Sequence, residues 1–206
     1  MRKDLQKPSR AKSTHEKSQV TVIIPTIGRP TLQRAIKSVE NQTYKNIEIL
    51  VIGEGGTDFE LRLGRNWNKF SKGKSFGAAQ RIVGTHLATG DYIAYLDDDN
   101  EFLPDHIESL VECIKTHDVD FVYSKAHIIG SKKYIGDEYP NNGRIDTNCI
   151  LHKIENILIS NWKSDGYNAE YKLVTRWIKK GLKFNYLNKT TVKYYEDIRC
   201  NPPVPN

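Results

Sequence analysis

The stretch YIAYLDDD at residues 92–99 decides the expected fold, because an apolar run ends there in three consecutive aspartates. A short run rich in β-branched and aromatic residues, preceded by a Gly-Asp turn, is typical of a buried strand. Carboxylates crowded at the end of such a strand repel one another and resist burial unless water, hydrogen-bond donors or a cation neutralises them. The carboxyl ends of strands are also where open α/β sheets bind ligands. The stretch therefore predicts either a metal–diphosphate site or a solvated acidic turn.

The metal alternative has a definite chemistry. Mg²⁺ and Mn²⁺ prefer carboxylate oxygens, and Mg²⁺ commonly binds between one or two carboxylates and a phosphate. The three aspartates therefore suggest a divalent cation and, through it, a phosphate-bearing ligand.

The chain on either side of this stretch reads as alternating strands and helices. We expect strands at residues 20–24, 47–52, 92–96 and 120–124. Between them we expect one helix capped by Thr31, one over residues 75–88, and one with Pro104 in its first turn. This β-α-β-α-β-α-β order predicts an α/β fold with a mostly parallel sheet and helices on both faces.

The later part of the chain is less regular. Residues 125–150 read as a hairpin and loop, and an apolar stripe predicts a helix over residues 169–180 that ends at Gly181. Short strands are expected near residues 182–186 and 191–195. We expect the sheet as a whole to carry a small antiparallel addition.

A chain of 206 residues is long enough for one domain with a sizeable core. We expect a disordered basic tail at residues 1–19, one domain at residues 20–199, and a proline-rich tail at residues 200–206. The chain is also short enough to be one domain of a longer polypeptide.

The positive charge is concentrated at the start of the chain. Lysine plus arginine exceed aspartate plus glutamate by 6, and residues 1–19 carry +4 of that excess. The rest of the chain lacks the excess of basic residues that is expected of a domain that binds nucleic acid. The tail either keeps the protein soluble or touches anionic lipid electrostatically.

Three widely spaced cysteines, Cys113, Cys149 and Cys200, suggest a reducing compartment rather than a disulfide framework or a zinc site. The first residues have no apolar core of a signal peptide, and no run approaches the length that spans a bilayer. We therefore expect a cytoplasmic protein, with the tail available to the inner face of a membrane.

Five short motifs give the chain a resemblance that covers residues 19–195. They are VTVIIPT at 20–26, SVENQTY at 38–44, GAAQRIVG at 77–84, ATGDYI at 88–93, and DDD at 97–99 followed by Pro104. Their order and spacing resemble family 2 glycosyltransferases of the GT-A fold, the fold of nucleotide-diphospho-sugar transferases. The last motif falls where that family has its D-x-D motif.

The resemblance implies transfer of a sugar from a nucleotide diphosphate sugar to a hydroxyl acceptor, with Mn²⁺ or Mg²⁺ stabilising the departing diphosphate. By position, Asp99 is the first choice for the metal ligand. Asp97 or Asp98 would bind the ribose hydroxyls, or the metal through water, and the sequence does not separate those two roles.

The resemblance also implies a nucleotide pocket. Glu54 takes the place of a family aspartate that recognises the base edge, at the end of the second expected strand. Pro25, Thr26 and Ile27 would line the base pocket, and Arg81 would reach base or phosphate. We expect a UDP-sugar donor, but the change from aspartate to Glu54 weakens the case for UDP and leaves a dTDP-sugar open, because a glutamate carboxylate can accept the N3–H of uracil or of thymine.

An inverting enzyme of this kind needs a carboxylate as general base. The run AEYKL at 169–173 stands where the family has "E-D-Y-x-L", so Glu170 takes the catalytic position. Asp165, in the nearby Ser-Asp-Gly turn, is the alternative base.

The acceptor is expected to be a glycan or glycolipid. His152 and Trp67 are the candidate acceptor contacts, and a structural role for each is the alternative. Trp162 and Tyr167 are further candidates for a stacking platform.

Two other functions stay open. One is a sugar nucleotidyltransferase, which has a related sheet, although the glycine-rich signature after its first strand is missing here. The other is a catalytically silent module that binds a sugar nucleotide, because glutamates replace family aspartates at positions 54 and 170.

Overall fold

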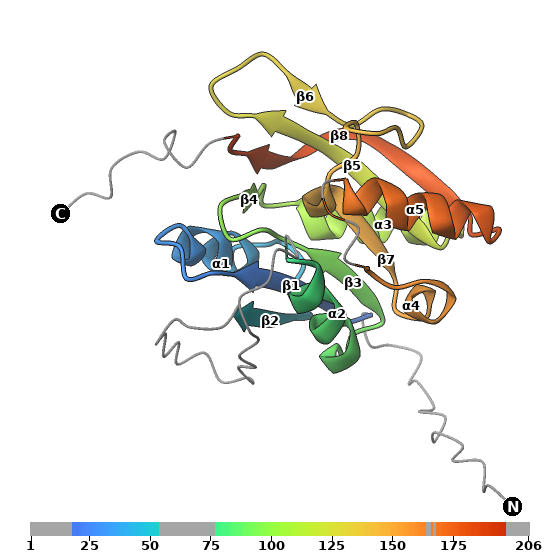
Figure 1. Ribbon diagram of the computed structural model, residues 1–206. Helices are drawn as coiled ribbons and strands as arrows, with labels where there is room; N and C mark the ends of the chain where they lie inside the picture. The colour runs from blue at the N-terminus through green and yellow to red at the C-terminus, as the bar shows by residue number, and fades with distance from the viewer. Residues whose placement is uncertain (1–17, 54–76, 164–165, 167, 197–206) are drawn as a thin grey trace, which may run out of the picture.

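The computed structural model describes residues 18–53, 77–163, 166 and 168–196. Its centre is an eight-stranded sheet in the order β2-β1-β3-β7-β5-β8-β4, with β6 paired to β5 (Figure 1). The strands are β1 (Val20–Thr26), β2 (Ile47–Gly53), β3 (Tyr92–Tyr95), β4 (Glu101–Phe102), β5 (Phe121–Ile128), β6 (Tyr134–Ile135), β7 (Ile150–Lys153) and β8 (Phe184–Tyr194). The helices are α1 (Leu32–Glu40), α2 (Ala78–Leu87), α3 (His106–His117), the 3₁₀ turn η1 (Thr147–Cys149), α4 (Asn156–Ile159) and α5 (Ala169–Lys179).

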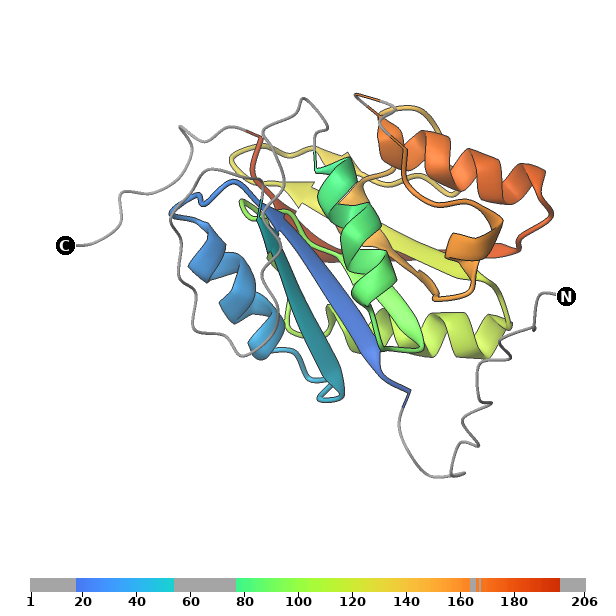
Figure 2. The same ribbon diagram turned by 60° about the horizontal axis from the view of Figure 1, so that its bottom comes forward.

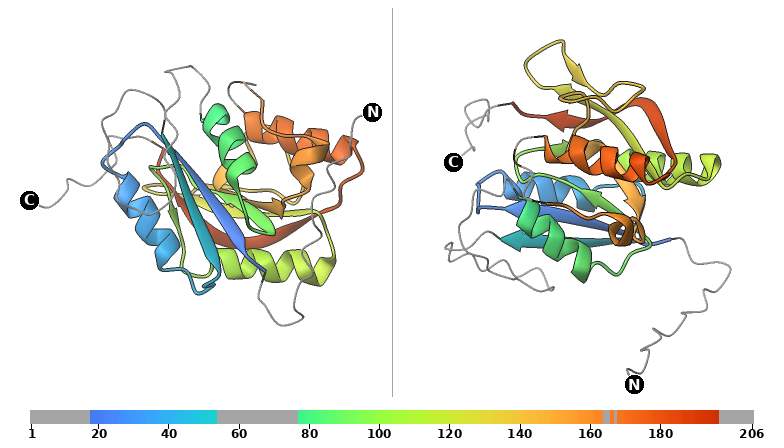
Figure 3. Two further views of the ribbon diagram at one scale, coloured as in Figure 1. Left: turned by 90° about the horizontal axis from the view of Figure 1, so that it is seen from below. Right: turned by 45° about the vertical axis from the view of Figure 1, so that its right-hand side comes forward.

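The α/β fold expected from the sequence is confirmed. Strands β2, β1 and β3 run parallel, and so do β5 and β8, so most paired residues lie in parallel ladders. All seven residues of β1 are buried, because helices cover both faces of the sheet. Figure 3 shows α1 and α3 on one face and α2, α4 and α5 on the other.

The sheet differs from the prediction at β7, for which the sequence predicted no strand. This strand lies antiparallel between β3 and β5 and pairs with both. Its residues Ile150, Leu151 and His152 are fully buried. The insertion separates β3 from β5, so the parallel strands form two groups.

The two short strands expected at the end of the chain are one strand, β8. It pairs in parallel with β5 along its length and antiparallel with β4 near its end. The register shifts between Tyr123 and Lys125, where β8 carries extra residues. That irregularity is the break that the sequence pattern suggested between two strands.

The ends of α1 and α5 agree with the sequence in position but not always in mechanism, and α3 begins at His106, two residues after the Pro104 that was expected in its first turn. Thr31 precedes α1 as expected, but its side chain makes no capping hydrogen bond, and its Oγ1 has no partner among the described residues. Gly181 ends α5 with a φ of 86°. The N–H groups of Gly181 and Leu182 donate to the carbonyls of Ile178 and Trp177, which is a Schellman motif.

One hydrophobic core runs through the described residues, from β1 to Val192 in β8. Figure 2 shows the strands and helices that contribute to it in a second view. Within it Cys113 and Cys149 are free buried thiols, whereas Cys200 lies outside the described residues. In the part of the chain that the structure describes, no helix is long and apolar enough to cross a bilayer.

Candidate functional site

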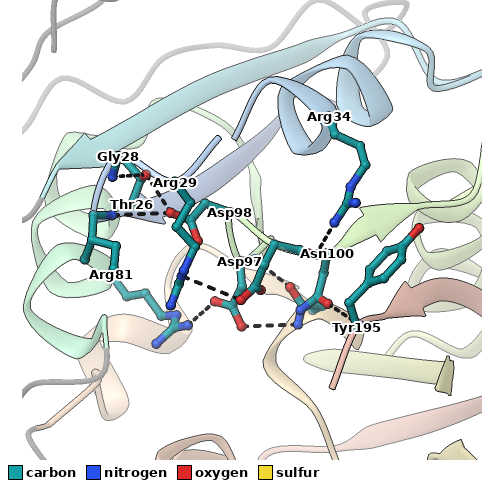
Figure 4. A network of polar contacts seen from close by, with 12 residues as sticks. Thr26, Gly28, Arg29, Arg34, Arg81, Asp97, Asp98, Asn100 and Tyr195 are labelled. Carbon is teal, nitrogen blue, oxygen red and sulfur yellow. Dashed lines mark hydrogen bonds and ion pairs between the residues drawn. The ribbon is translucent and has the colours of Figure 1, made fainter. Parts of the chain in front are cut away.

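A cleft of about 400 Å³ lies where β1 and β3 end. The N-terminal ends of α2 and α5, the residues before η1 and the end of β8 complete its walls. Figure 4 shows part of the polar network that lines it. The volume suits a small-molecule ligand. The carboxyl groups in the cleft are Asp97, Asp98, Asp99, Asp146, Glu170 and Glu196.

Asp98 is the buried member of the aspartate triplet, with 1% of its surface exposed. Its carboxylate accepts hydrogen bonds from the Thr26 hydroxyl at 2.6 Å and the Ile27 N–H at 3.3 Å, and it forms an ion pair with Arg29. These contacts tie the end of β3 to the end of β1. Asp98 therefore shapes the cleft wall instead of projecting freely into it.

Asp97 is more exposed and is held by two other residues. It forms an ion pair with Arg81, and the Asn148 side-chain amide donates to its carboxylate at 3.3 Å. Its own backbone N–H donates to the Asn148 side-chain carbonyl at 2.6 Å. The carboxylate thus has a fixed direction within the cleft.

The charged form of Asp99 is disfavoured by its surroundings. Burial, and then the charge of Asp97, raise its pKa to about 6. The Arg29 guanidinium, 3.6 Å from the Asp99 carboxylate, opposes that shift. Arg29 stabilises the charged form of Asp99 only in part. A bound cation would stabilise it further.

Arg81 connects the start of α2 to the aspartates. Its guanidinium lies 5.0 Å from the Trp162 ring centroid, which fixes its plane as it pairs with Asp97. Gly77, immediately before α2, has a φ of 77°, and a Cβ there would lie 3.0 Å from the Arg81 guanidinium. The glycine therefore leaves room for the arginine inside the cleft.

Glu170 enters the cleft from the first turn of α5. Burial is the main cause that raises its pKa, and the charge of Asp97 adds to it, while Arg81 and Lys172 oppose the shift. A carboxylate with a raised pKa is a better proton acceptor than an ordinary surface glutamate.

Asp146 is a cleft residue that the sequence analysis missed. Burial, and then the charge of Asp97, raise its pKa to about 7. The Asn148 backbone N–H and side-chain amide both donate to its carboxylate, at 2.9 and 2.6 Å. The sequence held one signal, because Asp146 stands two residues before Asn148 as an N-cap would.

The comparisons with known proteins agree with this geometry. The family model described as "Glycosyl transferase family 2" matches residues 21–177. This chain belongs to glycosyltransferase family 2. An uncharacterised glycosyltransferase of Rickettsia conorii is 38% identical over 133 residues, which are 61% of this chain and 22% of that protein.

A characterised family 2 relative comes from Escherichia coli. It is the UDP-Glc:alpha-D-GlcNAc-diphosphoundecaprenol beta-1,3-glucosyltransferase WfgD, 27% identical over 127 residues, or 57% of this chain and 49% of that protein. This chain therefore spans between about a fifth and a half of the two relatives.

Solved structures confirm the GT-A fold of this family 2 chain. Staphylococcus aureus TarS 1–349 in complex with UDP has a TM-score of 0.70 at 13% identity, over 86% of this chain and 60% of that one. The mannosyltransferase PcManGT of Pyrobaculum calidifontis, in complex with GDP-Man and Mn²⁺, has a TM-score of 0.68 at 16% identity, over 95% of this chain and 62% of that one.

The structure brings most of the candidate residues of the family 2 chain into one cleft. Those that line it are Pro25, Thr26, Ile27, Arg81, Asp97, Asp98, Asp99 and Glu170. The candidates that lie outside the described residues are Glu54, Trp67, Asp165 and Tyr167. Trp162 is 3% exposed and packs against Tyr95 and Arg81, so it belongs to the core beneath the cleft.

His152 is not placed to contact an acceptor. It is fully buried in β7, where its Nδ1 donates to the Lys153 carbonyl at 2.7 Å and its Nε2 accepts from the Tyr95 hydroxyl at 2.8 Å. Burial lowers its pKa to about 4, so the ring is neutral. The geometry therefore supports a structural role for His152, which was the alternative to an acceptor contact.

The carboxylates fit a cation shared with a ligand. Among the described residues, no group of three or more histidine, cysteine, aspartate or glutamate side chains is arranged to hold a metal alone. Asp97 and Asp99 still offer carboxylate oxygens in one cleft. The raised pKa of Asp99 indicates that the neighbouring positive charge does not fully stabilise its carboxylate. Such a pair suits a cation that phosphate oxygens also bind.

Proposed function

We propose that this chain transfers a sugar from a UDP-sugar to a hydroxyl group of a glycan or glycolipid, with inversion and with a divalent cation. The observation that carries the proposal is that Asp97, Asp99 and Glu170 line one cleft, although they come from different parts of the chain. A metal-binding pair and a proton acceptor are what this reaction requires.

The donor side of the cleft is built from β1, α2 and the aspartate triplet. Residues Pro25, Thr26 and Ile27 would hold the base, with Asp98 keeping them in position through its bonds to Thr26 and Ile27. The UDP complex of TarS supports a uridine donor by analogy of fold. Glu54, proposed for the base edge, lies outside the described residues.

Asp99 would hold the cation, with Asp97 binding it too or binding the donor ribose. Mn²⁺ or Mg²⁺, when bound there, stabilises the negative charge that builds on the departing diphosphate. Arg29 and Arg81, which pair with the aspartates here, are positioned to bind phosphate oxygens as well. The Mn²⁺ in the PcManGT complex supports this use of a metal in the fold.

Glu170 would accept the proton of the acceptor hydroxyl as that oxygen attacks the sugar. Burial raises its pKa, which makes it a stronger proton acceptor than an exposed glutamate. A single displacement from the face opposite the diphosphate inverts the anomeric carbon. Asp165 remains the alternative base by sequence.

The acceptor assignment rests on the relatives. The name of the E. coli relative gives a sugar on diphosphoundecaprenol as its acceptor, which supports a glycolipid acceptor for this chain. We further propose that it acts in the cytoplasm, at the inner face of a membrane, where nucleotide sugars and such lipids meet.

The test is to incubate the purified chain with labelled UDP-sugars, with and without Mn²⁺, and to follow UDP release and sugar transfer. We expect metal-dependent turnover of at least one UDP-sugar. UDP binding without turnover on any acceptor would favour the silent module. Release of pyrophosphate from UTP and a sugar phosphate would favour the nucleotidyltransferase.

A further inference from the structure

Two aliphatic side chains on α4 lie exposed next to each other. Leu158 is 83% exposed and Ile159 is 49% exposed. The other exposed large apolar residues of the described chain are Ile27, Tyr134 and Tyr139, which lie in other elements. Neighbouring exposed aliphatic residues mark an interaction surface more often than a scattered exposed residue does.

Contacts with α5 keep α4 in place. The Trp177 indole N–H donates to the Ser160 carbonyl at 2.8 Å, and the Arg176 Nε donates to the Ser160 hydroxyl at 3.0 Å. Trp177 is fully buried, so the segment just after Ile159 is anchored to the core. Leu158 and Ile159 are therefore presented at the surface by a segment that is anchored to the core.

The helix that contacts the end of α4 is rich in basic residues. Along α5, Lys172, Arg176 and Lys179 recur at helical spacing, so they share one side of the helix, and Lys180 and Lys183 follow directly after it. Residues 153–183 contain seven lysines and arginines against three acidic residues, a net charge of +4.

The chain enters the fold at the same edge. Asp91 accepts from the Gln19 N–H at 3.1 Å and, through its carbonyl, from the Ile154 N–H at 3.0 Å. Gln19 therefore lies close to Ile154, which stands two residues before α4. Residues 1–17 carry a further net charge of +4.

Two segments of the sequence therefore hold the excess of positive charge. The segments 1–17 and 153–183 carry +4 each against a total of +6, so all remaining residues together carry −2. Exposed aliphatic side chains beside a basic helix are the pattern of a surface that binds anionic lipid.

We propose that Leu158 and Ile159, together with Lys172, Lys179, Lys180 and Lys183, form a docking surface for an anionic lipid bilayer. Leu158 and Ile159 enter the headgroup region, and the lysines bind lipid phosphates. The proposal rests on the proposed glycolipid acceptor, because α5 links this surface to the cleft. Its 11 residues, Ala169–Lys179, span about 16 Å, with Glu170 in the first turn at the cleft and Lys179 at the other end.

The test measures co-sedimentation of the full chain with vesicles of phosphatidylcholine alone and of phosphatidylcholine mixed with phosphatidylglycerol. We expect binding to the anionic vesicles that weakens when salt rises from about 0.1 to about 0.5 M. The double variants Leu158→Gln/Ile159→Gln and Lys179→Glu/Lys180→Glu should each lower the partition constant by about tenfold or more.

Matched controls lie elsewhere on the surface. Lys132→Glu/Lys133→Glu makes the same charge change in the β5–β6 hairpin, and Tyr139→Gln removes another exposed apolar side chain. Both should bind vesicles within about twofold of the wild type, given the local reach of these forces. The exposed positions of all these residues allow the variants to fold, which circular dichroism would check.

Three results would overturn the proposal. The first is failure of the wild type to bind anionic vesicles. The second is a loss of binding in the control variants as large as that in the α4 and α5 variants. A dimer that becomes a monomer in Leu158→Gln/Ile159→Gln would show that a second copy covers the surface. Because the assay contains no donor, metal or acceptor, any of these results leaves the proposed transfer reaction untouched.

Discussion

Asn148 holds Asp97 from 51 residues further along the chain, with its side-chain carbonyl 2.6 Å from the Asp97 backbone nitrogen. The same amide group donates to the Asp97 and Asp146 carboxylates. Asn148 is fully buried at the junction of η1 and β7. The insertion of β7 beside β3 is therefore what gives the proposed metal-binding aspartate its orientation.

We expect Asn148→Ala to lower kcat/KM by about 10- to 100-fold, because Asp97 loses its fixed direction. The measurement is steady-state transfer together with the Mn²⁺ dependence, which should shift to higher concentration. Asn156→Ala is the matched control, since Asn156 is also buried and its amide donates to the Asp120 carbonyl away from the cleft. Equal loss of activity in the two variants would mean that Asn148 acts only through stability.

Glu170→Gln should lower kcat by about 100-fold or more, because general base catalysis contributes that much. UDP affinity, measured by calorimetry, should stay within about twofold, since the change removes a proton acceptor and keeps the shape. Full activity in Glu170→Gln together with its loss in Asp165→Asn would transfer the role to Asp165.

Gly84→Ala should destabilise the fold by about 1–3 kcal/mol, as overpacking of a core does. A Cβ at Gly84 in α2 would lie 2.5 Å from the Ile23 Cγ2 of β1. Helix propensity alone predicts the opposite sign. Urea unfolding gives the measurement, and Ile23→Ala in the same chain should recover part of the loss; strict additivity of the two changes would contradict the contact.

The buried His106 should make stability fall in acid. Burial lowers its pKa to about 3, while the unfolded value is about 6.5. Below pH 6.5 the unfolded chain therefore binds a proton that the folded chain does not, and the free energy of unfolding decreases as pH falls, by up to about 1.4 kcal/mol per pH unit.

The carboxyl groups of Asp99 and Asp146 titrate with the opposite sign, because their folded pKa values are raised. The test is therefore the difference between the wild type and His106→Asn, whose amide can still contact the Thr191 hydroxyl that His106 Nδ1 meets at 2.7 Å. The stability advantage of the wild type should shrink by about 2 kcal/mol between pH 7.5 and pH 5. An advantage that does not change with pH would show that His106 is not neutral in the fold.

The sequence predicted the parallel part of the fold because local pattern and tertiary role agree there. Strands β1, β2 and β3 are apolar runs buried on both faces, and α1, α3 and α5 carry clear apolar stripes. It missed β7, because a four-residue strand has too little pattern to separate it from a loop. Its place between β3 and β5 depends on pairing with distant residues, which no local pattern contains.

The sequence predicted those residues of the candidate site that lie in recognisable motifs. Asp97, Asp98 and Asp99 follow the end of β3, and the burial of Asp98 became clear only from its contacts with Thr26, Ile27 and Arg29. Asp146 was missed because the long connection after β6 brings it to the cleft from a part of the sequence without a motif.

The most direct test is a crystal structure of the chain with UDP and Mn²⁺, with the metal located by its anomalous scattering. Our account predicts one manganese peak in contact with the Asp99 carboxylate and the UDP diphosphate, and its absence in Asp99→Asn. Nucleotide bound away from the cleft that Asp97, Asp99 and Glu170 line, or bound there with no metal at Asp99, would contradict it.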